Sequence, residues 1–180
     1  MAIWRQSIIY MKNINKIYYQ GSKGSYSESV LKSYFPNKQY VECQTFREVV
    51  AQTGEDNYGL LPVENSLVGT VVDSYENLIQ SELIVYGEFK KKITHALIGL
   101  KDSKIENIER VISHPQALQQ CSNFLQEMNV QLQPVFDTAG SVLSLLDEES
   151  ETIAGIAGEH FEGDNRFKVL KKSISNHVEN

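Results

Sequence analysis

The spacing of hydrophobic residues switches repeatedly between a strand-like and a helix-like period along this chain. In the first half, short β-branched and aromatic runs predict buried strands at residues 14–19, 39–43 and 58–61. Helices are predicted to start at Ser25 and Thr45, because each of these residues lies three positions before a glutamate in a capping box. A third helix is predicted from Asp73 towards Gln80.

The alternation continues in the second half of the chain. Strands are predicted at residues 83–89, 93–100, 110–112, 130–135 and 152–156. Pro115 suits the first turn of a helix, and that helix carries an apolar stripe of Ala117, Leu118, Cys121, Phe124, Leu125 and Met128. Asp137 or Thr138 is expected to cap another helix. Strands that alternate with helices predict an α/β fold with mostly parallel sheets, covered on both faces.

Two such units, joined by the strands at 83–89 and 93–100, predict a two-lobed protein with an interlobe cleft. The first lobe is expected to span residues 1–91, with residues 172–180 returning to it, and the second to span residues 92–171. Residues 1–10, before Met11, are interpreted as a leader or as the product of an upstream start.

Composition and charge narrow the class of protein. With 41% hydrophobic and 22% charged residues, the chain is typical of packed globular proteins. A net charge of −6, with Lys90-Lys91-Lys92 as the one basic cluster, argues against nucleic acid or an anionic membrane as the main partner. No apolar run approaches the roughly 18 residues of a membrane span, and no secretion signal is recognisable. We therefore expect a cytoplasmic protein, with Cys43 and Cys121 as buried free thiols.

Four polar segments follow predicted strands and precede or open helices, the position where α/β proteins bind ligands. They are residues 21–28, 62–70, 113–120 and 137–141, all rich in Ser, Thr, Asn or Gly. Each could instead be only a helix cap, but four together favour a binding site. We expect a small anion to bind between residues 62–66 and 113–116.

Other chemistries are disfavoured by the same residues. The segment at 21–28 lacks the pattern of a nucleoside-triphosphate loop. Ser113 and His114 are neighbours in sequence, which rarely gives the geometry of a nucleophile and its base. The four histidines and two cysteines lack metal-ligand spacing, so no metal site is expected. His95 and His177 are interpreted as structural or solvated.

The four polar segments also carry recognisable motifs. Residues 21–28 match G-P-x-G-[TS]-[FY]-S-E with Ser22 in place of proline, and residues 58–66 contain G-x-x-P-[IV]-E-N-S. Residues 113–121 match S-H-P-Q-x-x-x-Q-C, and residues 137–141 and 153–157 correspond to two looser motifs. In this order, the motifs make the chain resemble the catalytic domain of prephenate dehydratases from about Ile17 to Asn180.

This resemblance implies a fold like that of type II periplasmic binding proteins, with the active site in the interlobe cleft. It implies that prephenate loses water and carbon dioxide to give phenylpyruvate, in phenylalanine biosynthesis and without a cofactor. It also implies a homodimer or larger homo-oligomer. The catalytic residues would be Asn65, Ser113 and Gln120. The substrate-binding residues would be Ser25, Ser27, Glu64, Ser66, Thr70, His114, Thr138 and Ala139.

One family motif is missing from the sequence. The family places Thr-Arg-Phe soon after a segment like residues 176–180, and its threonine is thought to assist departure of the hydroxyl. Asn165-Arg166-Phe167 lies too early and has no threonine. We expect the sequence to be part of a longer protein, rather than a chain that lacks the catalytic group. The regulatory domain that many members carry downstream is likewise expected to lie outside these 180 residues, if the protein has one.

Two alternatives stay open at this point. The first is the same reaction on arogenate, the aminated counterpart of prephenate. The second is a binding module that holds a small anion with the same residues but does not catalyse, which only the missing threonine favours.

Overall fold

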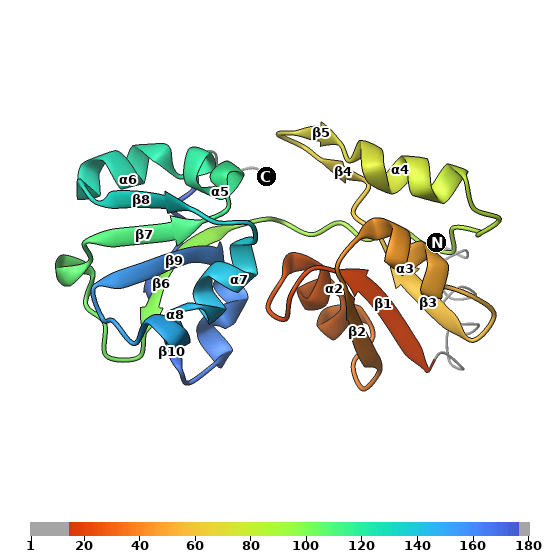
Figure 1. The fold of residues 1–180 in the computed structure, drawn as a ribbon, viewed down its shortest axis with the longest axis horizontal. Helices are drawn as coiled ribbons and strands as arrows, with labels where there is room; N and C mark the ends of the chain where they lie inside the picture. Colours follow the sequence, from red (N-terminus) through yellow and green to blue (C-terminus); the bar gives the residue numbers. More distant parts are fainter. Residues whose placement is uncertain (1–14, 177–180) are drawn as a thin grey trace. The chain divides into compact units, whose positions relative to one another are not determined.

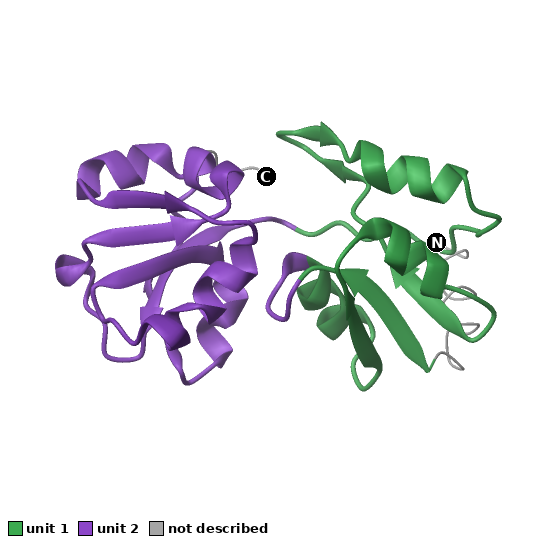
Figure 2. Cartoon of the chain, in the orientation of Figure 1, with its two compact units in different colours: residues 1–21, 27–91 green, residues 22–26, 92–180 purple. Residues whose placement is uncertain are grey.

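The computed structural model describes residues 15–176, and their contacts divide the chain into two units (Figure 2). The first unit comprises residues 15–21 and 27–91, and the second comprises residues 22–26 and 92–176. The main division therefore falls between Lys91 and Lys92, where the sequence predicts the lobe boundary. The proposed leader at residues 1–10 and His177 lie outside the described residues.

The first unit is built on a three-stranded parallel sheet of order β2-β1-β3 (Figure 1). The central strand β1 (Lys16–Gln20) lies between β2 (Gln39–Cys43) and β3 (Asn57–Leu60). The other elements of this unit are α2 (Tyr26–Tyr34), α3 (Phe46–Gln52), β4 (Glu64–Asn65), β5 (Gly69–Thr70) and α4 (Val72–Ile79).

Strand β1 is buried on both faces because its side chains are apolar on both. Ile17 and Tyr19 pack with Leu31 of α2, while Tyr18 packs on the other face with Cys43 and with Val49 of α3. Helix α3 begins at the second predicted capping box, since the Thr45 hydroxyl oxygen accepts the backbone N–H of Glu48 at 3.1 Å. The Glu48 carboxylate accepts the backbone N–H of Gln44 at 2.6 Å instead of that of Thr45.

The second unit is built on a five-stranded mixed sheet of order β10-β6-β9-β7-β8. Its strands are β6 (His95–Leu100), β7 (Arg110–Ser113), β8 (Gln131–Pro134), β9 (Ile153–Gly158) and β10 (Phe167–Lys171). Strand β7 is parallel to β8 and β9, whereas β6 is antiparallel to β9 and β10. Short 3-10 helices lie at Ile105–Asn107 and Glu159–Gly163.

Helices cover both faces of the second sheet (Figure 1). On one side lie α5 (Pro115–Gln120) and α6 (Ser122–Met128), and on the other α7 (Thr138–Leu143) and α8 (Leu145–Glu148). Along β6, Leu97 joins the cluster beneath α5 and α6, whereas Ala96 and Ile98 join the cluster beneath α7 and α8. This two-sided burial explains the uninterrupted apolar sequence of β6 and β9. The predicted α/β fold with mostly parallel sheets is confirmed.

Three predictions of secondary structure need correction. The predicted strand at 83–89 does not form, because this segment has no hydrogen-bonded partner strand among the described residues, and Ile84 and Val85 are exposed. The predicted strand at 93–100 begins only at His95. The helix that starts at Pro115 is interrupted at Cys121, whose backbone φ of −114° is not helical.

The expected return of residues 172–180 to the first lobe is wrong for the described part of that segment. The backbone N–H of Ile174 donates to the carbonyl of His95 at 3.0 Å, and that of Asn176 donates to the carbonyl of Gln120 at 2.7 Å. These bonds hold residues 172–176 on the second unit.

Two further predictions concern thiols and charge. Cys43 and Cys121 are buried free thiols, as predicted.

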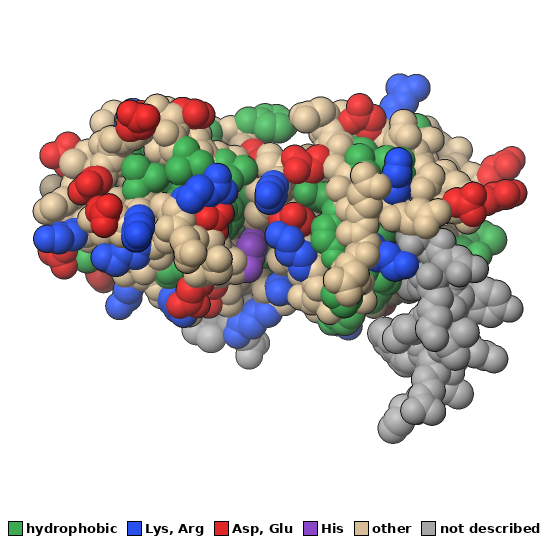
Figure 3. Space-filling model, turned by 90° about the horizontal axis from the view of Figure 1, so that it is seen from below, with side chains coloured by type: hydrophobic (Ala, Val, Ile, Leu, Met, Phe, Trp, Pro, Cys, Tyr) green, Lys and Arg blue, Asp and Glu red, His purple; other side chains and the backbone are tan. Residues whose placement is uncertain are grey.

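Basic and acidic side chains are interspersed on the face of the molecule shown in Figure 3. Among the described residues, no helix combines the length and apolar character needed to cross a bilayer.

Candidate functional site

The polar loop at residues 22–26 packs on the second unit although it follows β1 of the first. The Ser22 hydroxyl donates to the Asp137 carboxylate, and the imidazole Nε2 of His160 donates to the carbonyl of Gly24 at 2.6 Å. Gly24 has a φ of +84°, a conformation that favours glycine, and a Cβ at this position would overlap the Phe161 ring. The loop and the 137–141 segment, predicted separately as polar sites, are therefore neighbours.

The Asp137 carboxylate caps the N-terminus of α7. Its Oδ1 accepts the backbone N–H of Ala139 at 3.2 Å, and its Oδ2 accepts that of Gly140 at 3.0 Å. The Ala139 side chain is buried in the core of the second unit. Thr138, at the first position of the helix, is half-buried.

Ser113 and His114 serve different local purposes at the start of α5. Ser113 is fully buried, and its hydroxyl donates to the carbonyl of Ile156 on β9 at 2.8 Å. The His114 ring caps the helix, because its Nδ1 accepts the backbone N–H of Gln116 at 3.2 Å. A neutral His114 therefore carries its proton on Nε2. The prediction that Ser113 and His114 do not form a nucleophile and base pair agrees with these bonds.

Gln120 ends α5 and joins a chain of polar groups in which His95 is buried and Tyr26 and Gln120 are half-buried. Its Oε1 lies 2.8 Å from Nε2 of His95, whose Nδ1 lies 3.1 Å from the Tyr26 hydroxyl. The same hydroxyl lies 2.9 Å from the carbonyl oxygen of Thr94. Burial lowers the pKa of His95 below its usual value and raises the pKa of Tyr26, so both side chains are neutral at pH 7.

The neutral state of His95 predicts how stability changes with pH. The unfolded chain binds a proton on this imidazole below about pH 6.5, while the folded chain resists it, so stability should fall as the pH decreases through that region. We expect the difference in unfolding free energy between the wild type and His95→Gln to shrink from pH 8 to pH 5.5 in urea unfolding. A pH-independent difference would contradict a neutral, buried His95.

Asn176 holds the C-terminal described segment against the end of α5. Its side-chain amide nitrogen donates to the carbonyl of Gln119 at 3.1 Å and contacts the Ser122 hydroxyl at 3.0 Å. Its Oδ1 accepts the backbone N–H of Asn123 at 3.1 Å. These bonds satisfy backbone groups at the break between α5 and α6, beside Gln120.

In the first unit, the predicted residues Glu64, Asn65, Ser66 and Thr70 form the β4–β5 hairpin. Asn65 Oδ1 accepts the backbone N–H groups of Leu67 and Val68 at 2.9 and 3.2 Å, which fixes the amide within the turn. The Asn65 Nδ2 donors then point away from that turn. Glu64, Ser66 and Thr70 are exposed, and Asn65 is half-buried.

The two predicted serines of the first polar segment belong to different units. Ser25 lies in the loop that packs on the second unit, whereas Ser27 lies in α2 of the first unit. Both are half-buried. In the second unit, the structure brings the loop of Ser25 together with the segments of Gln120 and Thr138.

Sequence reasoning missed Tyr26, His95 and Asn176 as members of this polar network. His95 gave the clearest available signal, since it is the only charged or strongly polar side chain in the apolar run His95–Leu100. A buried polar group needs hydrogen-bond partners, and in the fold those partners are Gln120 and Tyr26.

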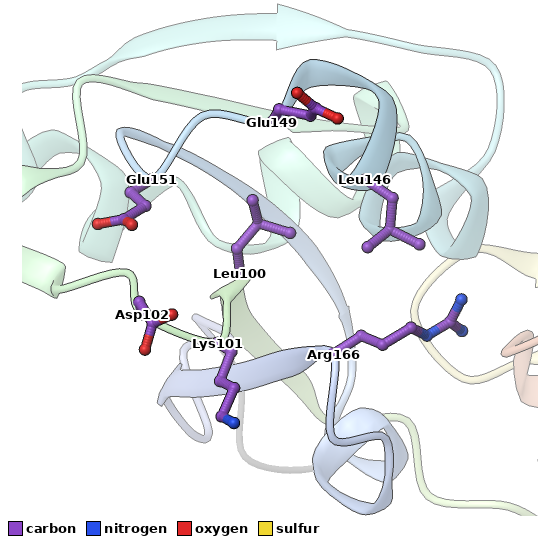
Figure 4. Close-up of a pocket in the computed structure, with 7 residues that line it drawn as sticks. All are labelled: Leu100, Lys101, Asp102, Leu146, Glu149, Glu151 and Arg166. Carbon is purple, nitrogen blue, oxygen red and sulfur yellow. The ribbon is translucent and has the colours of Figure 1, made fainter.

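A shallow hollow of about 320 Å³ elsewhere on the second unit contains none of the predicted site residues. Its lining residues are Leu100, Lys101, Asp102, Leu146, Glu149, Glu151 and Arg166. In Figure 4 their charged groups point in different directions instead of towards one centre. Arg166 is already paired with Asp164 at 2.7 Å, and this pairing lowers the pKa of the Asp164 carboxyl to about 2. We therefore place the candidate site at Gln120 and not at this hollow.

Within residues 15–176, no group of three or more His, Cys, Asp or Glu side chains is arranged to hold a metal ion. The polar groups at the candidate site are amides, hydroxyls and imidazoles.

Comparison with known proteins agrees with these motifs. The family model of prephenate dehydratase matches residues 17–180. The chain is 34% identical to arogenate dehydratase/prephenate dehydratase 2 (chloroplastic) of Arabidopsis thaliana, over 92% of this chain and 44% of that protein. The chain thus spans less than half the length of this relative.

Solved structures share the fold. A structure described as a novel type of quorum quenching acylase, GqqA, is 26% identical with a TM-score of 0.81, over 90% of this chain and 60% of that one. A prephenate dehydratase from Arthrobacter aurescens, in complex with L-Phe, is 22% identical with a TM-score of 0.81, over 92% of this chain and 57% of that one.

Proposed function

This chain belongs to the prephenate dehydratase family, and we propose that it converts prephenate to phenylpyruvate in aromatic amino-acid biosynthesis. The observation that carries the proposal is the family match over residues 17–180, which includes all the predicted polar segments. The named relative of Arabidopsis thaliana supports the same class of reaction.

The reaction needs few chemical groups from the protein. The bond between the ring and its carboxylate breaks, the electron pair enters the ring, and the hydroxyl leaves as water after gaining a proton. Because the product ring is aromatic, the step is strongly downhill. The protein has to bind two carboxylates, orient the ring and deliver a proton, and it needs no redox chemistry.

The hydrogen bonds of three predicted residues suit a dianionic substrate. Asn65 and His114 each accept backbone N–H groups with one atom, and Gln120 has its Oε1 beside His95. Asn65 therefore offers Nδ2–H groups, and His114 offers Nε2–H. Gln120 offers Nε2–H groups when His95 donates to its oxygen. We propose these N–H groups as the donors for the substrate's oxygens.

Ser113 has a different proposed role. Its hydroxyl donates to a backbone carbonyl, so it contributes by fixing the end of β7 beneath His114 in the described structure. The same bond gives no support for an acyl-transfer nucleophile, even though one structural neighbour is described as an acylase. We retain Ser25, Ser27, Glu64, Ser66, Thr70 and Thr138 as proposed substrate contacts.

The dehydratase proposal predicts phenylpyruvate formation when the protein is mixed with prephenate. The expected result is the appearance of enolised phenylpyruvate absorbance in alkali for the longest protein that the gene encodes. No turnover by the longest protein would overturn the enzyme proposal. Binding of prephenate by calorimetry without turnover would instead identify a non-catalytic binding module.

Arogenate is the second candidate substrate, because the Arabidopsis thaliana relative carries both activities in its name. Incubation with arogenate should give phenylalanine in place of phenylpyruvate, measured by amino-acid analysis. A higher kcat/KM for arogenate than for prephenate would reassign the substrate while leaving the class of reaction unchanged.

We also propose a cytoplasmic location and a homodimeric or larger assembly. The free, buried thiols at Cys43 and Cys121 suit a reducing compartment. Light scattering on the purified protein would test the assembly, and fluorescence of a tagged protein in its own cells would test the location.

A further inference from the structure

Tyr26, His95 and Gln120 form a line of contacts from the loop at 22–26 to the end of α5 within the second unit. His95 is 3% exposed. Its backbone pairs with Gly158 of β9, and its carbonyl accepts the backbone N–H of Ile174. The Tyr26 ring meets the rings of His95 and His160 edge to face, with centroids 6.0 and 5.6 Å apart. The imidazole therefore has little freedom to turn.

The hydrogens in this line are coupled, because a tyrosine hydroxyl and a neutral imidazole each have one proton to donate. If Tyr26 donates to Nδ1 of His95, the proton of His95 is on Nε2 and points at the Gln120 oxygen. The Tyr26 hydroxyl also donates to the Thr94 carbonyl at 2.9 Å, so its proton is shared between that oxygen and Nδ1 of His95. If the proton of His95 were on Nδ1 instead, its Nε2 could only accept. The Gln120 amide must then turn over and present its N–H to His95.

We propose that Tyr26 and His95 are positioning residues, which hold the Gln120 amide with its oxygen towards His95 and its N–H groups towards the ligand. The contact of the imidazole Nε2 with Oε1 of Gln120 at 2.8 Å corresponds to the arrangement in which Nδ1 of His95 accepts from Tyr26 and Nε2 donates to Gln120. The inference rests on the proposed function, because an anionic substrate requires N–H donors from Gln120. It adds two residues that neither touch the substrate nor belong to the predicted site.

The first test follows the side-chain amide of Gln120 directly, by its two proton–nitrogen NMR signals. Gln120→Ala identifies these signals by removing them. Tyr26→Phe deletes only the hydroxyl, and we expect it to move the Gln120 signals although it acts only through His95. Tyr75→Phe is the matched control, because Tyr75 is exposed on α4 of the other unit. Unmoved Gln120 signals in Tyr26→Phe would show that Tyr26 does not position the Gln120 amide through His95.

The second test measures turnover of prephenate. Tyr26→Phe should lower kcat about 2- to 12-fold, the rate equivalent of one hydrogen bond, with little change in KM. His95→Gln keeps an N–H that can reach Gln120 and should retain more activity than His95→Leu. Equal rates in those two variants, or an unchanged kcat in Tyr26→Phe, would overturn the positioning role.

The two tests separate this inference from the proposed function. A wild-type protein without turnover would refute the dehydratase proposal, while the NMR signals would still decide whether Tyr26 and His95 orient Gln120. Moved signals together with a lowered kcat would support both.

Discussion

Gln120→Ala is expected to lower kcat for prephenate by about 10²–10³-fold, the usual cost of removing one fixed donor from a site where charge develops. Gln120 lies at the end of α5, where its backbone carbonyl accepts the N–H of Asn176 and its side chain contacts His95. These contacts hold its amide before the substrate arrives, so the protein does not have to reorganise during the reaction. Steady-state kinetics with prephenate would measure the effect.

The matched control is Gln119→Ala, one position earlier on the same helix. Gln119 is exposed, and the bond it makes with Asn176 uses its backbone carbonyl, which the substitution preserves. We expect near wild-type kinetics from this variant, and similar thermal unfolding in both variants. Wild-type turnover in Gln120→Ala would show that the His95 contact is structural and that the amide has no part in the reaction.

Much of the fold was predictable because strands buried on both faces of a sheet have apolar residues at consecutive positions in the sequence. The runs around Ile17, Ile98 and Ile156 are apolar at consecutive positions, as strands between two layers of helices require. The capping box at Thr45 likewise marks the start of α3 to the residue. These signals are local, so a single sequence contains them.

The failures involve pairing between distant segments. Residues 83–89 have strand-like composition, but a strand also needs a partner, and the sequence alone does not reveal whether one is present. Strand β10 pairs with β6, nearly 70 positions away in the chain, and its composition gives no strong signal. The return of residues 172–176 to the second unit depends on Asn176, whose partners lie more than 50 positions earlier.

The candidate site was predictable in its segments but not in its hydrogen bonds. Ser113 and Gln120 differ by only seven positions, yet one is bonded to a backbone carbonyl and the other to a buried histidine. Sequence spacing locates both at the start and end of α5 and cannot distinguish those roles. His95 was interpreted as structural or solvated, because its partners Gln120 of α5 and Tyr26 of α2 lie 25 and 69 positions away in the chain.

Leu97→Ala should lower the free energy of unfolding by about 2–5 kcal/mol, the cost of emptying a leucine site in a packed core. Leu97 is fully buried on β6, two residues after His95, and it packs with Val111, Leu118 and Leu125 beneath α5 and α6. The cavity would open in the hydrophobic cluster to which Ala117 and Leu118 of α5 also belong. Urea unfolding followed by circular dichroism would measure the change.

Leu132→Ala provides the control for that loss. It removes the same atoms from β8, the edge strand of the same sheet, where the leucine is 46% exposed and leaves little cavity behind. We expect its unfolding free energy to change by less than about 1 kcal/mol. A similar loss of unfolding free energy in the two variants would mean that burial of Leu97 on β6 does not contribute more to stability than an exposed leucine does. A large loss in Leu97→Ala alone would show that the packing of Leu97 against this cluster stabilises the second unit.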